Sequence, residues 1–174
     1  MMGQLQDAGN VTTLAGYLEI LDQCALLTGL QKYANDEARR RGSIPKYQVY
    51  NNALLTAYKG RSFMADRTDT KVWGRWVESA VGAHLLSMAD ELDYKVFYWR
   101  EPSRNAALGD LEVDFVIVRD GEVTAIEVKS GRRGMNSGLP AFVEAFSPKR
   151  SFVVGTGGVS IEDFLNSEVE EFTT

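Results

Sequence analysis

The sequence predicts an α/β fold whose elements follow the order α-β-β-β-α-β from residue 71 onward. Apolar residues at helical spacing across 71–90 predict the longest helix of the chain. Two runs rich in β-branched residues within 111–128 flank an Asp-Gly pair, which is the strongest short-range signal for a β-hairpin. A helical pattern over 139–146 then leads to an apolar strand at 151–155. Such a helix supplies the crossover that lays the last strand parallel to the second strand of the hairpin.

The first 60 residues form a separate part of the predicted fold. Thr12 or Thr13 can cap a helix in which apolar residues recur every three or four positions. Extended runs at 26–33 and 45–50 flank a basic loop, so this part has the outline of a winged helix that lacks its earlier helices. We therefore expect two domains, a partial winged-helix-like segment at 1–60 and a larger domain at 61–174.

The remaining segments are assigned from their composition and from residues that start or stop helices. Pro148, for example, ends the helix at 139–146, because proline cannot continue a helical hydrogen-bond ladder. We expect a short helix at 51–58, a mixed-charge connection at 61–70, a strand at 94–100, polar or basic loops at 101–110 and 131–138, and a helical turn at 160–166.

The register of the hairpin follows from its turn. If Asp120 and Gly121 form the turn, Asp114 lies opposite Glu127, and Lys129 projects from the same face. Opposed residues have Cβ atoms about 4.5–5.5 Å apart, and two carboxylates at that separation repel unless they share a proton or bind a cation. Because Mg²⁺ is commonly held by one or two carboxylates, the pair is typical of a metal site.

The same register gives the hairpin an apolar opposite face, formed by Phe115 and the residues two positions before and after it. That face must pack on a core. A second interpretation of the polar face stays open, because Glu112 lies opposite Lys129 in this register. These two residues can form an ordinary cross-strand ion pair while Asp114 points to solvent near the sheet edge.

Glu78 is a third candidate carboxylate, at the margin of the apolar face of the helix at 71–90. Gly74 and Gly82 stand one helical turn before and after it. Glycine in a helix interior costs about 0.5–1 kcal/mol relative to alanine, so two of them indicate that another group approaches closely. Either Glu78 reaches the site of Asp114, or the glycines serve close packing of the helix on the sheet.

Composition places the chain among soluble globular proteins. Its 174 residues, of which 44% are hydrophobic, are enough for one good domain or a domain with a small appendage. No apolar run is long enough to span a membrane, and the N-terminus has no signal-peptide core. We therefore expect a cytoplasmic protein without a membrane partner. Cys24 is the single cysteine, which excludes an internal disulfide.

The net charge of −5 argues against a general nucleic-acid coat, but the cations are concentrated locally. Between residues 31 and 61, seven cations accompany two acids, a local net charge of +5. The candidate residues for contacting phosphate groups are Arg39, Arg40 and Arg41 in the first loop and Arg132 and Arg133 directly after the hairpin. A solvated turn is the alternative for the first three.

The pattern of Asp114, twelve intervening residues and then Glu127-Val128-Lys129 resembles the PD-(D/E)xK signature of the restriction-endonuclease-like nuclease superfamily, whose minimal core has the α-β-β-β-α-β order. A broader resemblance covers nearly the whole chain. The stretches GNVTTLAGYLEILDQCALLTGL, WGRWVESAVGAHLL, YWRE, EVDFV and IEVKSG are similar to the C-terminal region of bacterial and archaeal AAA-type ATPases. That region begins within a winged-helix segment and ends in a PD-(D/E)xK-like domain of unestablished function.

The resemblance implies a Mg²⁺- or Mn²⁺-dependent phosphodiesterase that acts on DNA, although nothing in the sequence separates DNA from RNA. Asp114, Glu127 and the carbonyl of Val128 would hold the metal, Glu78 would complete its shell, and Lys129 would position the attacking water. The P-loop ATPase domain is normally in the same polypeptide, but no P-loop motif occurs here, so this chain alone should not hydrolyse ATP. The alternative is a non-enzymatic module that binds DNA or a protein and regulates the ATPase.

Overall fold

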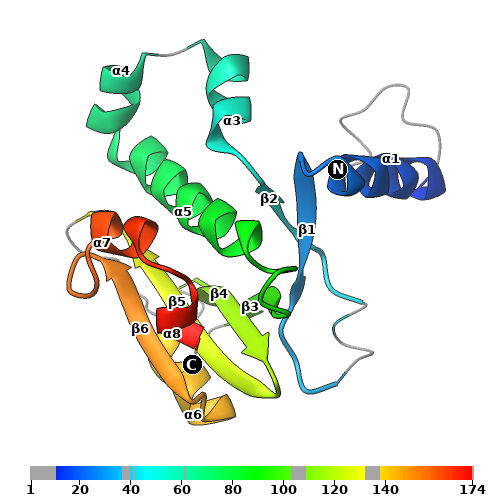
Figure 1. The fold of residues 1–174 in the computed structure, drawn as a ribbon, viewed down its shortest axis with the longest axis vertical. Coiled ribbons are helices and arrows are strands. Elements are labelled where there is room, and N and C mark those ends of the chain that lie inside the picture. Colours follow the sequence, from blue (N-terminus) through cyan, green and yellow to red (C-terminus); the bar gives the residue numbers. More distant parts are fainter. Residues whose placement is uncertain are drawn as a thin grey trace.

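The structure is a computed structural model that describes residues 11–36, 40, 42–60, 62–102, 109–131 and 138–173. In these residues the chain forms one mixed six-stranded sheet in the order β2-β1-β3-β4-β5-β6 (Figure 1). The strands are β1 (Leu27–Lys32), β2 (Lys46–Val49), β3 (Lys95–Glu101), β4 (Leu111–Arg119), β5 (Glu122–Lys129) and β6 (Arg150–Gly155). The predicted α/β fold class is confirmed.

Helices cover both faces of the sheet. They are α1 (Val11–Gln23), α3 (Asn52–Lys59), α4 (Phe63–Thr68), α5 (Thr70–Ser87), α6 (Leu139–Phe146), α7 (Ile161–Asn166) and α8 (Glu170–Thr173). The long helix α5 and the C-terminal helices share one core with the sheet, and α6 packs on the other face. Figure 1 shows α3 and α4 as an arm that extends away from the sheet beyond one end of α5. Within the described part of the chain, no helix combines the length and the apolarity that crossing a membrane requires.

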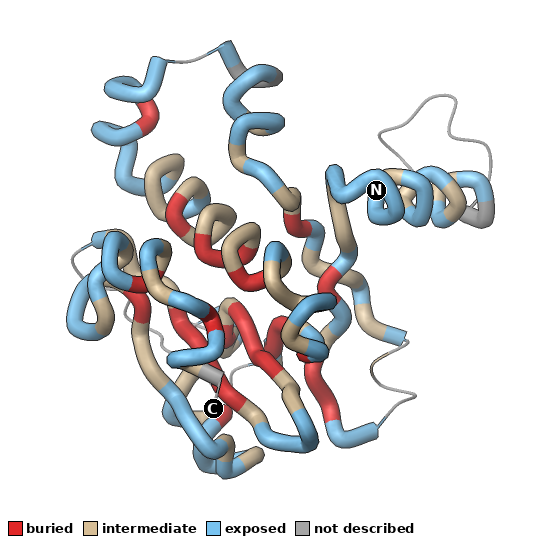
Figure 2. The backbone as a smooth tube through the Cα atoms, in the orientation of Figure 1, coloured by how far each residue is buried: buried red, intermediate tan, exposed pale blue. Residues whose placement is uncertain are grey.

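The central strands are buried on both faces (Figure 2). In β4, the consecutive residues Phe115, Val116 and Ile117 are each at most 1% exposed. Phe115 and Ile117 lie in the core shared with α5, whereas Val116 lies in the core shared with Phe142 of α6. A strand covered on both faces buries consecutive apolar residues in this way, although β4 pairs antiparallel with both of its neighbours. Of the apolar face expected on the hairpin, Phe115 and Ile117 lie together in the core under α5, but Val113 lies in the core under α6, so that part of the prediction was wrong.

The hairpin turn sets the register that the sequence predicts. Asp120 and Gly121 have φ values of 51° and 80°, the left-handed conformation that a two-residue hairpin turn of this kind requires at both central positions. The paired residues run from Arg119 opposite Glu122 to Phe115 opposite Ile126. The predicted register is therefore confirmed as far as Phe115, where the printed pairing of β4 with β5 ends.

The connection expected at 61–70 contains a helix, α4. Ser62 begins α4 by accepting a hydrogen bond from the amide of Ala65, and Asp69 begins α5 by accepting from the amides of Lys71 and Val72. Side-chain caps of this kind satisfy amides that have no partner inside the helix. The mixed charges of this segment concealed the start of α4, whereas α5 begins one residue before the predicted position.

The first two strands join the main sheet rather than forming a separate unit. β1 and β2 form the expected antiparallel hairpin, but β1 also pairs in parallel with β3, through Gln31 with Phe97 and Lys32 with Tyr98. The predicted boundary at residue 60 therefore falls between segments that share one sheet. This arrangement brings β2 beside α5, which carries Glu78.

Candidate functional site

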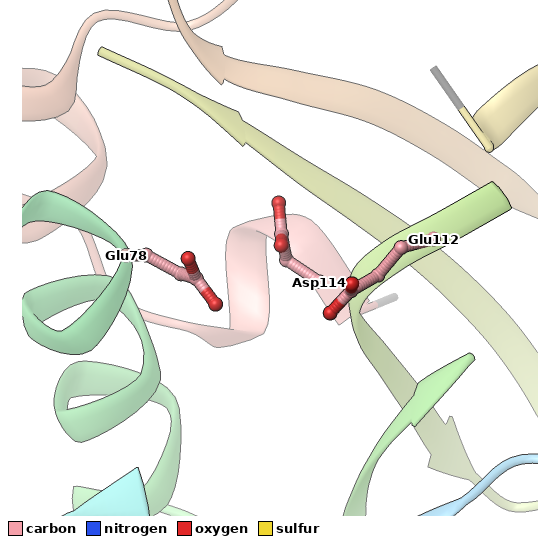
Figure 3. A group of neighbouring side chains, drawn as sticks. All are labelled: Glu78, Glu112 and Asp114. Atoms are coloured by element: carbon pink, nitrogen blue, oxygen red, sulfur yellow. The ribbon is translucent and has the colours of Figure 1, made fainter. Parts of the chain in front are cut away.

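Three carboxylates converge on the face of the sheet that α5 covers. Glu78 projects from α5 toward Glu112 and Asp114 on β4 (Figure 3). One oxygen atom from each side chain lies within 4.8 Å of the corresponding atoms of the other two. We call these residues the acidic cluster. They are half-buried, and Asp114 is the least exposed, with 16% of its side chain accessible.

A bulge in β4 places Asp114 on this face. Phe97 pairs with Val116 and Trp99 with Val113, so a single residue of β3 faces two residues of β4, Asp114 and Phe115. In a β-bulge the extra residue breaks the alternation of side chains between the two faces. Phe115 lies in the core under α5, and the bulge turns Asp114 to the same side. The sequence-based prediction put Asp114 on the opposite face from Phe115, and that part of it was wrong.

The backbone of β5 also contacts Asp114. Beyond the last paired residues of the two strands, the amide of Val128 donates a hydrogen bond of 2.8 Å to Asp114 Oδ2. Where β4 and β5 separate, the side-chain carboxylate of Asp114 thus accepts the hydrogen bond of a β5 amide, in place of a backbone carbonyl of β4. Val128, expected to supply its carbonyl group to the site, supplies its amide to Asp114.

Lys46 on β2 occupies the centre of the acidic cluster. Its Nζ lies 2.6 Å from Glu78 Oε1, 3.0 Å from Glu112 Oε1 and 3.5 Å from Asp114 Oδ1. The same ammonium group lies 5.5 Å from the centre of the Phe115 ring. On its outer side, Glu112 also accepts hydrogen bonds from Arg100, with Nη2 at 2.7 Å. The three negative charges are thus partly neutralised by two cations of the protein.

The electrostatic environment shifts the pKa of several of these groups. Burial, followed by the negative charge of Glu78, raises the pKa of Asp114 from 3.8 to about 7. Burial by itself would lower the pKa of Lys46, but the carboxylates of Glu78, Asp114 and Glu112 outweigh it and raise that pKa. Burial also opposes the ionisation of Glu112, yet Lys46 and Arg100 together lower its pKa. The cluster is therefore more stable with a cation bound among the carboxylates than with three carboxylates that are all ionised and unpaired.

Close contact between α5 and β2 fixes the backbone that carries Lys46. A Cβ atom added to Gly82 would lie 2.4 Å from Oε1 of the buried Gln48 and 2.8 Å from Cζ of Phe115. Gln48 donates a hydrogen bond of 2.9 Å to the carbonyl of Ser79 on α5. An added Cβ at Gly74 would be 3.2 Å from Ser130 Oγ. The close approach expected at the two glycines is present, and at Gly82 it serves packing of the helix on the sheet.

Comparison with known proteins identifies a family but no function. A family model described as a domain of unknown function, DUF4143, matches residues 73–167, more than half of the chain. The chain belongs to the DUF4143 family. The matched segment includes all three residues of the acidic cluster, whereas Lys46 precedes it. No significant match was found among curated proteins or among solved structures.

Glu127 and Lys129 lie apart from the acidic cluster of this DUF4143 domain. Along β5, Ala125 packs in the core under α6 and Ile126 in the core under α5. Regular alternation then places Glu127 and Lys129 on the α6 side of the sheet. Their side chains form their own ion pair, with Lys129 Nζ 3.4 Å from Glu127 Oε1. The structure thus brings together Glu78 and Asp114 of the predicted site residues, and it leaves Glu127 and Lys129 outside their cluster.

Of the five predicted arginines, Arg40 is the one that the structure describes. Arg40 packs its guanidinium group over the rings of Tyr33 and Phe97, at 5.9 and 5.6 Å from the ring centres. Its Nε donates a hydrogen bond to the carbonyl of Ala34. The other four predicted residues, Arg39, Arg41, Arg132 and Arg133, lie outside the described residues.

Two site residues of the DUF4143 domain were missed by sequence reasoning. Glu112 was considered only as a partner of Lys129, and Lys46 was counted only within the basic N-terminal segment. Glu112 precedes Asp114 by two positions, so the alternation of a strand signals that they share a face. Lys46 is 68 residues from Asp114 in the sequence, and no local pattern connects them.

Proposed function

We propose that this DUF4143 domain is a nuclease-like module, a metal-dependent phosphodiesterase that acts on DNA. The convergence of Glu78, Glu112 and Asp114 at the point where β4 leaves β5 is the observation that carries the proposal. The α-β-β-β-α-β order from α5 to β6 supports it, because the resemblance to PD-(D/E)xK nucleases implies this core. The proposal assigns the metal-binding role of Glu127 to Glu112.

The carboxylates fit a hard divalent cation such as Mg²⁺ or Mn²⁺. Both ions prefer oxygen ligands, and octahedral ligands about 2.1 Å from Mg²⁺ lie about 3–4 Å from one another. The oxygens of the acidic cluster lie within 4.8 Å of one another, so a small inward movement would complete three positions of such a shell. A bound divalent ion would polarise a phosphate group and lower the pKa of a coordinated water.

The protein groups around the acidic cluster have separate tasks in this proposal. The amide of Val128 holds the carboxylate of Asp114 in one orientation through Oδ2, which leaves Oδ1 directed at the centre of the cluster. Arg100 holds Glu112 in the same manner. Lys46 takes the place that the sequence gave to Lys129: it lines the neighbouring cavity, from which its ammonium group would position the attacking water or stabilise developing negative charge on a phosphate group.

A neighbouring cavity supports a phosphodiester substrate. It has a volume of about 390 Å³ and is lined by the cationic side chains Lys32, Lys46 and Arg100, together with Tyr98 and Asp110. Cations along a groove position a sugar-phosphate backbone without reading its sequence. DNA is the substrate we propose, RNA is an outcome of the test, and an AAA-type ATPase domain in the same polypeptide is the proposed partner.

The proposal is tested by measuring Mn²⁺ binding by calorimetry and cleavage of plasmid DNA, single-stranded DNA and RNA. Asp114→Asn and Glu78→Gln should each weaken Mn²⁺ binding by more than about tenfold and abolish cleavage, because each removes a ligand. Glu122→Gln is the matched control, since Glu122 lies beside the turn of the same hairpin and pairs with Lys149 at the surface. Cleavage that persists without Asp114 would refute the assignment.

A second candidate function is a non-enzymatic interaction module. It is favoured by the ammonium group of Lys46, which already neutralises the acidic cluster, and by an apolar cavity of about 310 Å³ between α3, α4, α5 and α7. Phe63 lines this cavity and is 63% exposed, as is its neighbour Met64. Under this alternative, wild-type protein binds no metal at millimolar concentration, and Phe63→Ser weakens association with the ATPase domain.

A further inference from the structure

We propose that Lys46 is the resident counter-ion of the acidic cluster and that a divalent cation enters the site only by displacing its ammonium group. This inference rests on the proposed function, because it describes how metal reaches the same three carboxylates. It concerns a competition between two cations, one of which the protein itself supplies.

The geometry makes the two cations mutually exclusive. Lys46 Nζ is 2.6–3.5 Å from one oxygen of each carboxylate. A metal ion about 2.1 Å from the same oxygens would occupy the space of the ammonium group. Two cations held that close together repel strongly in a half-buried site. Occupation by a metal therefore requires the side chain of Lys46 to leave.

A cavity next to the acidic cluster can accommodate the displaced ammonium group of Lys46. The cavity of about 390 Å³ beside the acidic cluster is lined by Lys46 itself, by Asp110, and by the cations Lys32 and Arg100. Both of these cations already have a carboxylate partner, Glu101 for Lys32 and Glu112 for Arg100. A lysine side chain has four flexible methylene groups, so its ammonium group can rotate into this space while the backbone of β2 stays in place. The carboxylate of Asp110 lines the same cavity and would accept the displaced charge.

The backbone that carries Lys46 is held firmly, so movement is confined to the side chain. The buried Gln48 ties β2 to α5 through the carbonyl of Ser79. On the other side, the hydroxyl of Tyr98 donates a hydrogen bond of 2.6 Å to the carbonyl of Ile44. The structure thus presents a fixed strand with a movable cation at its start.

The experiment compares Mn²⁺ affinity of the full chain, by calorimetry, between wild type, Lys46→Met and Lys129→Met. Among the described residues, removing Lys46 leaves the three carboxylates with Arg100 as their ion-pair partner, so Lys46→Met should bind Mn²⁺ about tenfold more tightly or better. Lys129→Met is the matched control, because it removes the same group from the ion pair with Glu127 outside the cluster. Its Mn²⁺ affinity should equal that of wild type.

The outcomes separate this inference from the proposed function. Equal or weaker Mn²⁺ binding by Lys46→Met overturns the inference, while binding and cleavage by wild type still support the nuclease. Tight binding by Lys46→Met with none by wild type supports the inference and refutes the catalytic proposal, since Lys46 would then close the site permanently. Absence of binding by both proteins overturns both.

A second measurement covers the case in which Lys46→Met does not fold. In wild-type protein with ¹³C-labelled lysine, addition of Mg²⁺ should shift the ε-methylene signal of Lys46, assigned with Lys46→Arg, and leave that of Lys129 unchanged. A Lys46 signal that stays constant while Mg²⁺ binds would overturn the inference.

Discussion

The contact between α5 and β2 gives a sharp test of how the site is built. Gly82→Ala places a Cβ 2.4 Å from Gln48 Oε1 and 2.8 Å from Phe115 Cζ, and Phe115 is fully buried. Overpacking of this kind costs about 1–3 kcal/mol. Alanine regains about 0.8–1.0 kcal/mol of helix propensity over glycine. We expect a net loss of up to about 2 kcal/mol of unfolding free energy.

Gly74→Ala is the matched substitution, one helical turn on the other side of Glu78. Among the described residues, its added Cβ would meet the hydroxyl oxygen of Ser130, at 3.2 Å. The gain in helix propensity should therefore dominate, with stability unchanged or raised by up to about 1 kcal/mol. Both variants are compared with wild type by urea denaturation. The reasoning is refuted if Gly82→Ala is as stable as Gly74→Ala.

Two further predictions concern the charge of the site and the core beneath α6. The pKa of Asp114 is raised from 3.8 to about 7 in the folded protein, so its protonation stabilises the fold at low pH, and this contribution is lost as the pH rises through about 7. Relative to Asp114→Asn, wild type should lose about 2–3 kcal/mol of unfolding free energy between pH 5 and pH 8. Urea denaturation that gives the same stability difference between the two proteins at both pH values would contradict this. Phe142→Ala should cost about 3–5 kcal/mol, because Phe142 is fully buried beside Trp99 and Phe146. Phe63→Ala, at a position 63% exposed, should cost under about 1 kcal/mol, and similar losses for both phenylalanines by the same assay would contradict the assignment of the core.

The local signals in the sequence were sufficient for most of the fold from α5 onward. The turn at Asp120 and Gly121 fixed the hairpin register, because a two-residue turn determines which residues face each other. The period of the apolar residues placed α5 and α6 within a few residues of their ends. These features depend on residues close together in the chain, so a single sequence contains them.

The pairing of β1 with β3 was decided only by the tertiary structure. It joins the N-terminal strands to the main sheet and carries β2 to the side of α5. Lys46 and Gln48 on β2 therefore meet residues of α5 and β4 that lie 31 to 68 positions away. Periodicity and turn composition report on neighbours along the chain, and they contain no information on such contacts.

The face of the sheet on which Asp114 lies was also determined by the tertiary structure. Counting outward from the turn assumes an unbroken alternation, and that assumption holds as far as Phe115. The extra residue of β4 against β3 then breaks the alternation, so Asp114 lies on the face opposite to the one predicted. On that face Asp114 is separated from Glu127 and lies beside Glu78 and Glu112. The sequence by itself determined which carboxylates were available near the hairpin. The bulge and the long-range pairing of β1 determined which of them meet, and which lysine lies among them.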